Sequence, residues 1–138
     1  MIRCIALLCC AFAIPSAGAA QTEPVLSSAK VPKYPTLACQ ARVEGTVRLT
    51  FTLPANATEP TNIEAVSGHP ILKGEAIENV KTWRFDNPYA VERKYETTFK
   101  YRLSGVEVVG TKKLTVTFDS FRYVEVLTDS PVTTVNAY

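Results

Sequence analysis

The sequence predicts an α+β fold in which one main helix packs on one face of a small antiparallel sheet. Residues 46–53 and 94–103 alternate between apolar and polar side chains, which is typical of half-buried strands. Between them, residues 72–83 place apolar side chains at helical spacing. The length of 138 residues fits one domain with one core. The net charge of +2 is spread without a basic run, which argues against nucleic acid as a partner.

The N-terminus has the layout of a secretory signal peptide, which we expect to cover residues 1–20. Arg3 precedes an apolar run that ends at Ile14, and Pro15 and several small residues follow. This run is shorter than the ~20 residues that a membrane-spanning helix needs. The sequence therefore favours cleavage and export, with no integral membrane span afterwards. An uncleaved N-terminus that holds the protein at the envelope is the alternative.

Residues 21–33 are small, polar and interrupted by Pro24 and Pro32, so we expect a short tether that buries little. Three of the four cysteines lie in the expected signal peptide, and cleavage leaves Cys39 alone. No internal disulfide is then expected. Cys39 lies in a short apolar run typical of a helix, where a lone cysteine is usually a small buried hydrophobe.

The first strand is framed by residues that control the backbone. The Tyr34-Pro35 pair predicts an extended start, because proline disfavours the helical region for the residue before it. Gly45 stands where the short helix must turn into the strand, and a residue without Cβ suits such a reversal. After a loop at 54–60, residues 62–66 return as a second strand.

The helix begins after Ser67-Gly68-His69, because Pro70 is tolerated in a first turn. Its apolar face ends at Trp83, and Phe85 follows two residues later. We expect this aromatic pair to pack in the core rather than to stack on a ligand. The expected core residues are Tyr34, Pro35, Gly45, Val47, Leu49, Phe51, Leu72, Ile77, Val80, Trp83 and Phe85.

An ordered set of motifs is shared with a known family. The set comprises Tyr34-Pro35, Glu44-Gly45, a strand, Ser67-Gly68-His69-Pro70, an apolar helix and Trp83-Arg84-Phe85. It resembles the C-terminal domain of the energy-transducing TonB family, which shares its shape with the end domain of TolA. The resemblance implies a domain over residues 34–104 and a periplasmic location. In TonB proteins a transmembrane helix and a long proline-rich spacer precede this domain, and the expected signal peptide and tether depart from that pattern.

The resemblance makes the strand at 94–103 the last of three antiparallel strands and the exposed edge of the sheet. A receptor segment can be added to such an edge as a further strand, held by backbone hydrogen bonds. The partners implied are segments of outer-membrane receptors or other envelope proteins, and a second copy of the chain paired through edge strands is a further candidate. The expected partner-binding residues are Tyr95, Glu96, Thr97, Thr98, Phe99, Lys100 and Tyr101.

Residues 105–129 lie beyond the resemblance but keep the pattern of strands. Segments 114–118 and 122–127 are rich in β-branched and aromatic residues, and Asp119-Ser120 between them suits a tight turn. We expect a hairpin that either enlarges the sheet or covers the edge used for strand addition. Residues 130–138 are expected to form a loose tail.

The sequence offers no set of residues typical of catalysis, metal binding or cofactor binding. His69 is the one histidine, and it has no nucleophile or second ligand at motif spacing. We therefore expect a protein without enzymatic activity, metal or cofactor. Two functions remain open: a peptide- or receptor-binding module associated with TonB-dependent transport, and a structural or assembly protein of the envelope that uses the same fold without transport coupling.

Overall fold

The computed structural model describes residues 23–132, so the expected signal peptide at 1–20 and the tail residues 133–138 lie outside the described residues. The predicted α+β fold is confirmed. The elements in chain order are β1 (Val25–Ser28), α1 (Thr36–Gln40), β2 (Gly45–Leu53), β3 (Thr61–Ser67), α2 (Pro70–Val80), β4 (Arg84–Asp86), β5 (Arg93–Val108), β6 (Leu114–Ser120) and β7 (Tyr123–Pro131).

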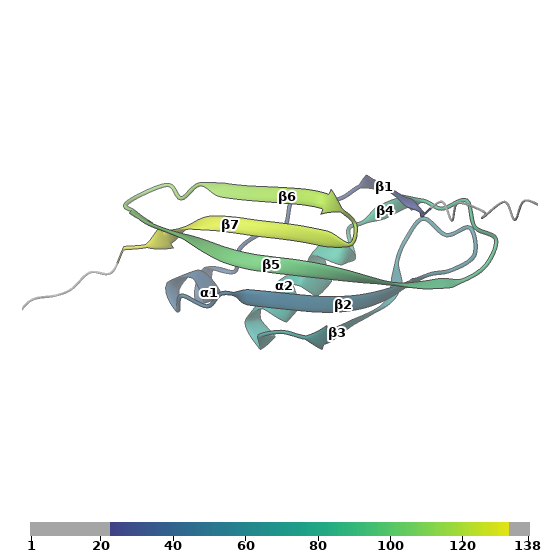
Figure 1. The fold of residues 1–138 in the computed structure, drawn as a ribbon, viewed down its shortest axis with the longest axis horizontal. Coiled ribbons are helices and arrows are strands. Elements are labelled where there is room, and N and C mark those ends of the chain that lie inside the picture. The colour runs from purple at the N-terminus through teal and green to yellow at the C-terminus, as the bar shows by residue number, and fades with distance from the viewer. Residues whose placement is uncertain (1–22, 133–138) are drawn as a thin grey trace, which may run out of the picture.

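The main sheet has five strands in the order β3-β2-β5-β7-β6 (Figure 1). The expected three-stranded unit is present as β3, β2 and β5, with both of its pairs antiparallel. The expected hairpin is β6 and β7, which are also antiparallel to each other, but its turn is at Phe121-Arg122 and the expected turn residues Asp119-Ser120 belong to β6. The hairpin joins the sheet through β7, which runs parallel to β5, so the sheet is not purely antiparallel.

The main helix, α2, lies behind the sheet in Figure 1 and contacts β2 and β3. Leu72, Ala76 and Val80 are fully buried on its inner side. Its start is capped by His69, whose Nδ1 accepts a hydrogen bond from the Ile71 amide at 3.3 Å. The one histidine therefore has a structural role at a helix end. None of the helices within residues 23–132 has the length and apolar character needed to cross a membrane.

Trp83 is fully buried at the centre of the core. Its ring stacks on Phe99 at a centroid distance of 5.9 Å and meets Phe51 edge to face at 6.0 Å. Its indole Nε1 donates to the Asn79 Oδ1 at 3.0 Å, which satisfies the one polar atom that the ring takes out of water. Its full burial agrees with the expectation that this tryptophan packs in the core rather than stacking on a ligand.

Most of the expected core residues are buried. Tyr34 and Ile77 are partly buried and pack against the core, and Pro35 and Gly45 are half-buried. The glycine that a close approach requires is Gly68, where an added Cβ would lie 2.8 Å from the Val47 Cγ2. Seven of the expected core residues are at most 1% exposed: Val47, Leu49, Phe51, Leu72, Val80, Trp83 and Phe85.

The expected tether is part of the fold, so the expectation that it buries little is wrong. Pro24 and Pro32 are buried, and β1 pairs with β4 in a second, two-stranded sheet. Asn79 donates to the Lys30 carbonyl at 2.8 Å and so ties the segment to α2. The composition of this segment did not predict its packing, because backbone pairing with β4 and the burial of two prolines need no apolar periodicity.

Two strands are longer than the alternation predicts. β5 continues to Val108, although its alternation ends near Leu103, because the register with β7 shifts between Leu103 and Glu107. Such an irregularity breaks the period of two that marks a strand in sequence. Ser130 and Pro131, expected in the tail, belong to β7, and Ser130 is 1% exposed.

Candidate interaction edges of the sheet

The strand expected to be the exposed edge, β5, lies inside the sheet. Thr98 to Leu103 pair in parallel register with Tyr123 to Thr128 of β7, and the Thr98 amide donates to the Arg122 carbonyl at 2.9 Å. The placement of this strand at the edge is therefore wrong for Thr98 to Tyr101. The physical reason is that the C-terminal hairpin takes up the hydrogen-bonding groups that the three-stranded unit leaves open.

The expected partner-binding residues divide between the two faces of β5. Lys100 and Thr98 lie half-exposed on the face away from the core. Glu96, on the same face, accepts two hydrogen bonds from Arg48 of β2, at 2.7 and 3.0 Å. The other four side chains are buried toward the core, at most 9% exposed: Tyr95, Thr97, Phe99 and Tyr101. Contact of these residues with a partner stays a prediction, but backbone pairing along Thr98–Tyr101 is already taken.

The start of β5 extends beyond the first residue of β7 and is covered there by the β6–β7 turn. Phe121 of the turn packs edge to face on the Tyr95 ring at 5.5 Å. Arg122 pairs with Glu23, and its guanidinium lies 5.9 Å from the Tyr95 ring centroid. The open part of this edge is thus confined to a few residues beside an occupied turn.

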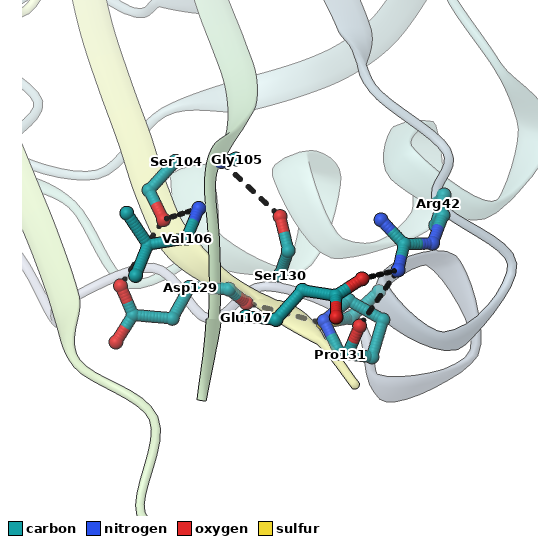
Figure 2. A network of polar contacts seen from close by, with 9 residues as sticks. Arg42, Ser104, Gly105, Val106, Glu107, Asp129, Ser130 and Pro131 are labelled. Carbon is teal, nitrogen blue, oxygen red and sulfur yellow. Dashed lines mark hydrogen bonds and ion pairs between the residues drawn. The ribbon is translucent and has the colours of Figure 1, made fainter. Parts of the chain in front are cut away.

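Polar contacts hold the far end of β5 to β7 (Figure 2). The Gly105 amide donates to the Ser130 Oγ at 3.2 Å, and the Ser104 hydroxyl to an Asp129 carboxylate oxygen at the same distance. Arg42, from the loop after α1, binds both the Glu107 carboxylate at 2.7 Å and the Pro131 carbonyl at 2.8 Å. These contacts link three segments that are far apart in sequence, so the hairpin is an integral part of the domain.

With β5 enclosed, β3 and β6 are the outer strands of the main sheet. The edge at β3 is irregular: its register with β2 shifts twice, and Asn62 has a φ of 48°. Glu64 is exposed on this strand. Irregular backbone and charge are features that protect an edge against further pairing.

The edge at β6 is regular over Leu114 to Phe118, and its register with β7 shifts only beyond this stretch, between Phe118 and Ser120. Leu114 to Phe118 pair with β7 without a register shift, and this stretch contains no charge and no proline. Leu114 is 40% exposed and Phe118 37% exposed. An unprotected edge with exposed apolar side chains is the surface in this sheet best suited to adding a strand. The alternating pattern was visible in the sequence, but its position at the edge was not.

Two hollows lie beside the apolar side chains of β6, on the core side of the sheet. One, of about 470 Å³, is lined by Leu114 together with Tyr34, Cys39 and Lys112. The other, of about 390 Å³, is lined by Phe118 together with Leu26 and Phe121. Side chains of an added strand that point to this face would have apolar surface beside them.

Cys39 is 5% exposed, as expected of a small buried hydrophobe. Its Sγ lies 3.2 Å from the Lys112 Nζ, which donates to it, and 3.9 Å from the Asp129 carbonyl. Across residues 23–132 there is no cluster of three or more His, Cys, Asp or Glu side chains that could hold a metal ion.

Tyr34 and Tyr101 give the domain a predicted sensitivity to alkali. Burial, aided by the negative charge of Glu44, raises the pKa of Tyr34 to about 12, against 10.0 for a free phenol. Burial raises the pKa of Tyr101 as well. A raised folded-state pKa means that the unfolded chain releases these protons first, so stability should fall as pH rises from about 10 towards 12.

This prediction is tested by measuring the free energy of unfolding across this pH range together with the absorbance of tyrosine phenolate. Tyr34→Phe should reduce the loss of stability with pH, because the phenylalanine has no proton to lose. Ionisation of Tyr34 near pH 10 in the folded protein would contradict the burial of its hydroxyl, which donates to the Val43 carbonyl at 2.6 Å.

Comparison with known proteins agrees with the resemblance seen in the sequence. The sequence model described as Gram-negative bacterial TonB protein C-terminal matches residues 30–103, more than half of the 138 residues. The solution NMR structure of the Pseudomonas aeruginosa TonB C-terminal domain is 25% identical, with a TM-score of 0.48 over 59% of this chain and 86% of that chain. No curated protein matches this chain. The chain belongs to the TonB C-terminal family.

Proposed function

We propose that this protein is a periplasmic binding module of TonB-dependent transport, and that it binds an extended segment of an outer-membrane transporter by adding it as a strand to β6. The family supports the partner class, because TonB C-terminal domains interact with outer-membrane receptors in the periplasm of Gram-negative bacteria. The observation that carries the choice of site is the regular, unprotected edge from Leu114 to Phe118.

The backbone of β6 supports strand addition at alternate residues. Asp129 donates its amide to the Lys113 carbonyl at 3.3 Å, so Lys113 is hydrogen-bonded to the neighbouring strand. Residues along a strand alternate in the direction of their amide and carbonyl groups. Leu114, Val116 and Phe118 therefore turn theirs away from β7, toward the free edge.

Titration of isotope-labelled protein with synthetic peptides from the N-terminal segments of outer-membrane transporters tests this proposal. The amide signals of Leu114, Val116 and Phe118 should shift most, and those of Thr98 to Tyr101 much less. Val116→Pro removes an amide that faces the free edge and should weaken binding about tenfold, the scale of one lost hydrogen bond. Val116→Ala keeps that amide and is the matched control.

Shifts that gather on β3, or on β5 alone, would contradict the choice of edge, and the absence of any shift with the transporter peptides would contradict the proposed function. Circular dichroism in the near ultraviolet should confirm that both variants are folded. Thr98→Pro is unsuitable as a binding test, because the Thr98 amide is already bonded to the Arg122 carbonyl and its loss would damage the sheet.

One observation favours the second candidate function, a structural or assembly role in the envelope without transport coupling. The family-matched region ends at residue 103, and the hairpin beyond it occupies the side of β5 that the three-stranded unit would leave open. Recovery of envelope structural proteins, and no transporters, in a pulldown from envelope extracts would support this alternative.

A further inference from the structure

The residues of β6 and of its flank form a self-complementary series. Read from Lys113 to Asp119, the order is Lys-Leu-Thr-Val-Thr-Phe-Asp. Reversing the order about Val116 places a cation opposite an anion, an apolar residue opposite an apolar residue, and threonine opposite threonine. We propose that two copies of this chain pair antiparallel through β6, in a register centred on Val116.

The backbone permits this register. The amides and carbonyls of Leu114, Val116 and Phe118 face the free edge, as the hydrogen bond from Asp129 to Lys113 requires. With Val116 opposite Val116, each Leu114 stands opposite Phe118 of the other copy. All the residues whose polar backbone groups face outward then meet each other in hydrogen-bonded pairs, and the same surface is used on both copies, as two-fold symmetry demands.

The side chains on the core face also match. Phe118 contacts the Trp83 ring at a centroid distance of 6.4 Å, and Val116 packs against the core, so this row points to the same face as α2. Leu114 and Phe118 are the exposed members of that row, at 40% and 37%. Cross-strand pairing would cover each with the other, and a pair of apolar residues directly opposite stabilises antiparallel strands.

Charge selects the register. Lys113 and Asp119 form no ion pair within residues 23–132, where six other pairs are found: Arg42–Glu107, Arg48–Glu96, Lys81–Glu78, Arg84–Glu59, Arg102–Glu125 and Arg122–Glu23. Centred on Val116, each Lys113 meets Asp119 of the other copy, at both ends of the paired strands. Centred one residue away, Lys113 would face Thr117 or Phe121 instead, and both charge pairs would be lost.

The outer strand at the other side of the sheet does not offer this match. The register shifts and the positive φ at Asn62 interrupt β3, and no charged residue on it opposes another of opposite sign. Self-pairing is thus assigned to β6 alone among the outer strands of the main sheet.

Self-pairing does not depend on the proposed binding of a transporter segment, but it would compete with that binding, because one edge cannot hold both. A second copy would then be the occupant of the edge in the absence of a transporter. Variants that cannot self-pair should accordingly bind the transporter peptides more tightly than the unchanged chain.

Sedimentation of the unchanged chain and of two charge reversals tests the register. Lys113→Glu and Asp119→Lys each place like charges opposite each other at both ends, and each should weaken self-association at least about tenfold. In an equimolar mixture of the two variants, opposite charges face each other again at both ends of the interface, so the mixture should restore the dimer, as should the double variant. Both side chains lie on the exposed flank of β6, so the folded domain should persist.

Hydrogen exchange gives an internal control. At low protein concentration the amides of Leu114, Val116 and Phe118 should exchange fast, while those of Thr115 and Thr117, bonded to β7, stay protected. At high concentration all five should be protected. A chain that stays monomeric at every concentration, reversals that dimerise as the unchanged chain does, or a mixture that stays monomeric would each overturn the proposal, whatever the peptide titrations show.

Discussion

A chain that ends at Val108 should lose cooperative folding, because the hairpin that it lacks supplies part of the core. Phe121, Val124 and Val126 are at most 4% exposed. Burial of a valine or phenylalanine side chain is worth about 1.5–3 kcal/mol, so three of them approach the ~5–15 kcal/mol that keeps a domain folded. The shortened chain would also leave the β5 hydrogen-bonding groups without partners.

Chemical denaturation followed by fluorescence and circular dichroism measures this effect, and a matched pair of variants within the hairpin refines it. Val126→Ala should destabilise by about 1–3 kcal/mol through lost burial. Thr117→Val, at an exposed position of similar shape, should stay within about 0.5 kcal/mol. If the chain ending at Val108 unfolds cooperatively with undiminished stability, the hairpin is an accessory and the β5 edge can be opened.

Trp83→Ala should destabilise the domain by about 3–5 kcal/mol, the range for removing a large buried aromatic side chain. The cost has two sources in this core. The ring is fully buried between Phe51, Phe85 and Phe99, and its removal leaves a void among them. Its loss also leaves the Asn79 Oδ1 without the indole donor, in a side chain that is itself 5% exposed.

Trp83→Phe separates these two sources, because it keeps an aromatic ring and removes the donor. Its cost should be smaller and close to the ~1–3 kcal/mol penalty of an unsatisfied buried acceptor. Val109→Ala is the surface control, since that valine is 87% exposed and its change should stay within about 0.5 kcal/mol. A shift below about 1 kcal/mol for Trp83→Ala would mean that the ring is accessible and would favour a role in stacking on a ligand.

Local patterns predicted the elements that depend on near neighbours in sequence. The period of two marked β2 and most of β5, and Pro70 with the apolar face up to Val80 marked α2. These patterns succeed because a half-buried strand or helix repeats the same contrast between core and solvent at a fixed spacing. Three elements gave weaker signals: β1 and β4 have too few residues for a period, and in the long strand β5 an irregularity after Leu103 interrupts the period.

The candidate site depended on information of a different kind. Alternation tells which side chains of a strand face the core, but it does not tell which strand lies beside it, because the pairing bonds join residues distant in the chain. The hydrogen bond from the Thr98 amide to the Arg122 carbonyl is such a contact. Because of this pairing, the free edge of the sheet is β6 and not β5. The sequence alone thus determined the family, the fold class and the self-complementary series at residues 113–119. Only the tertiary structure decided that this series lies on an open edge, because the edge of a sheet is defined by the pairing of all the other strands.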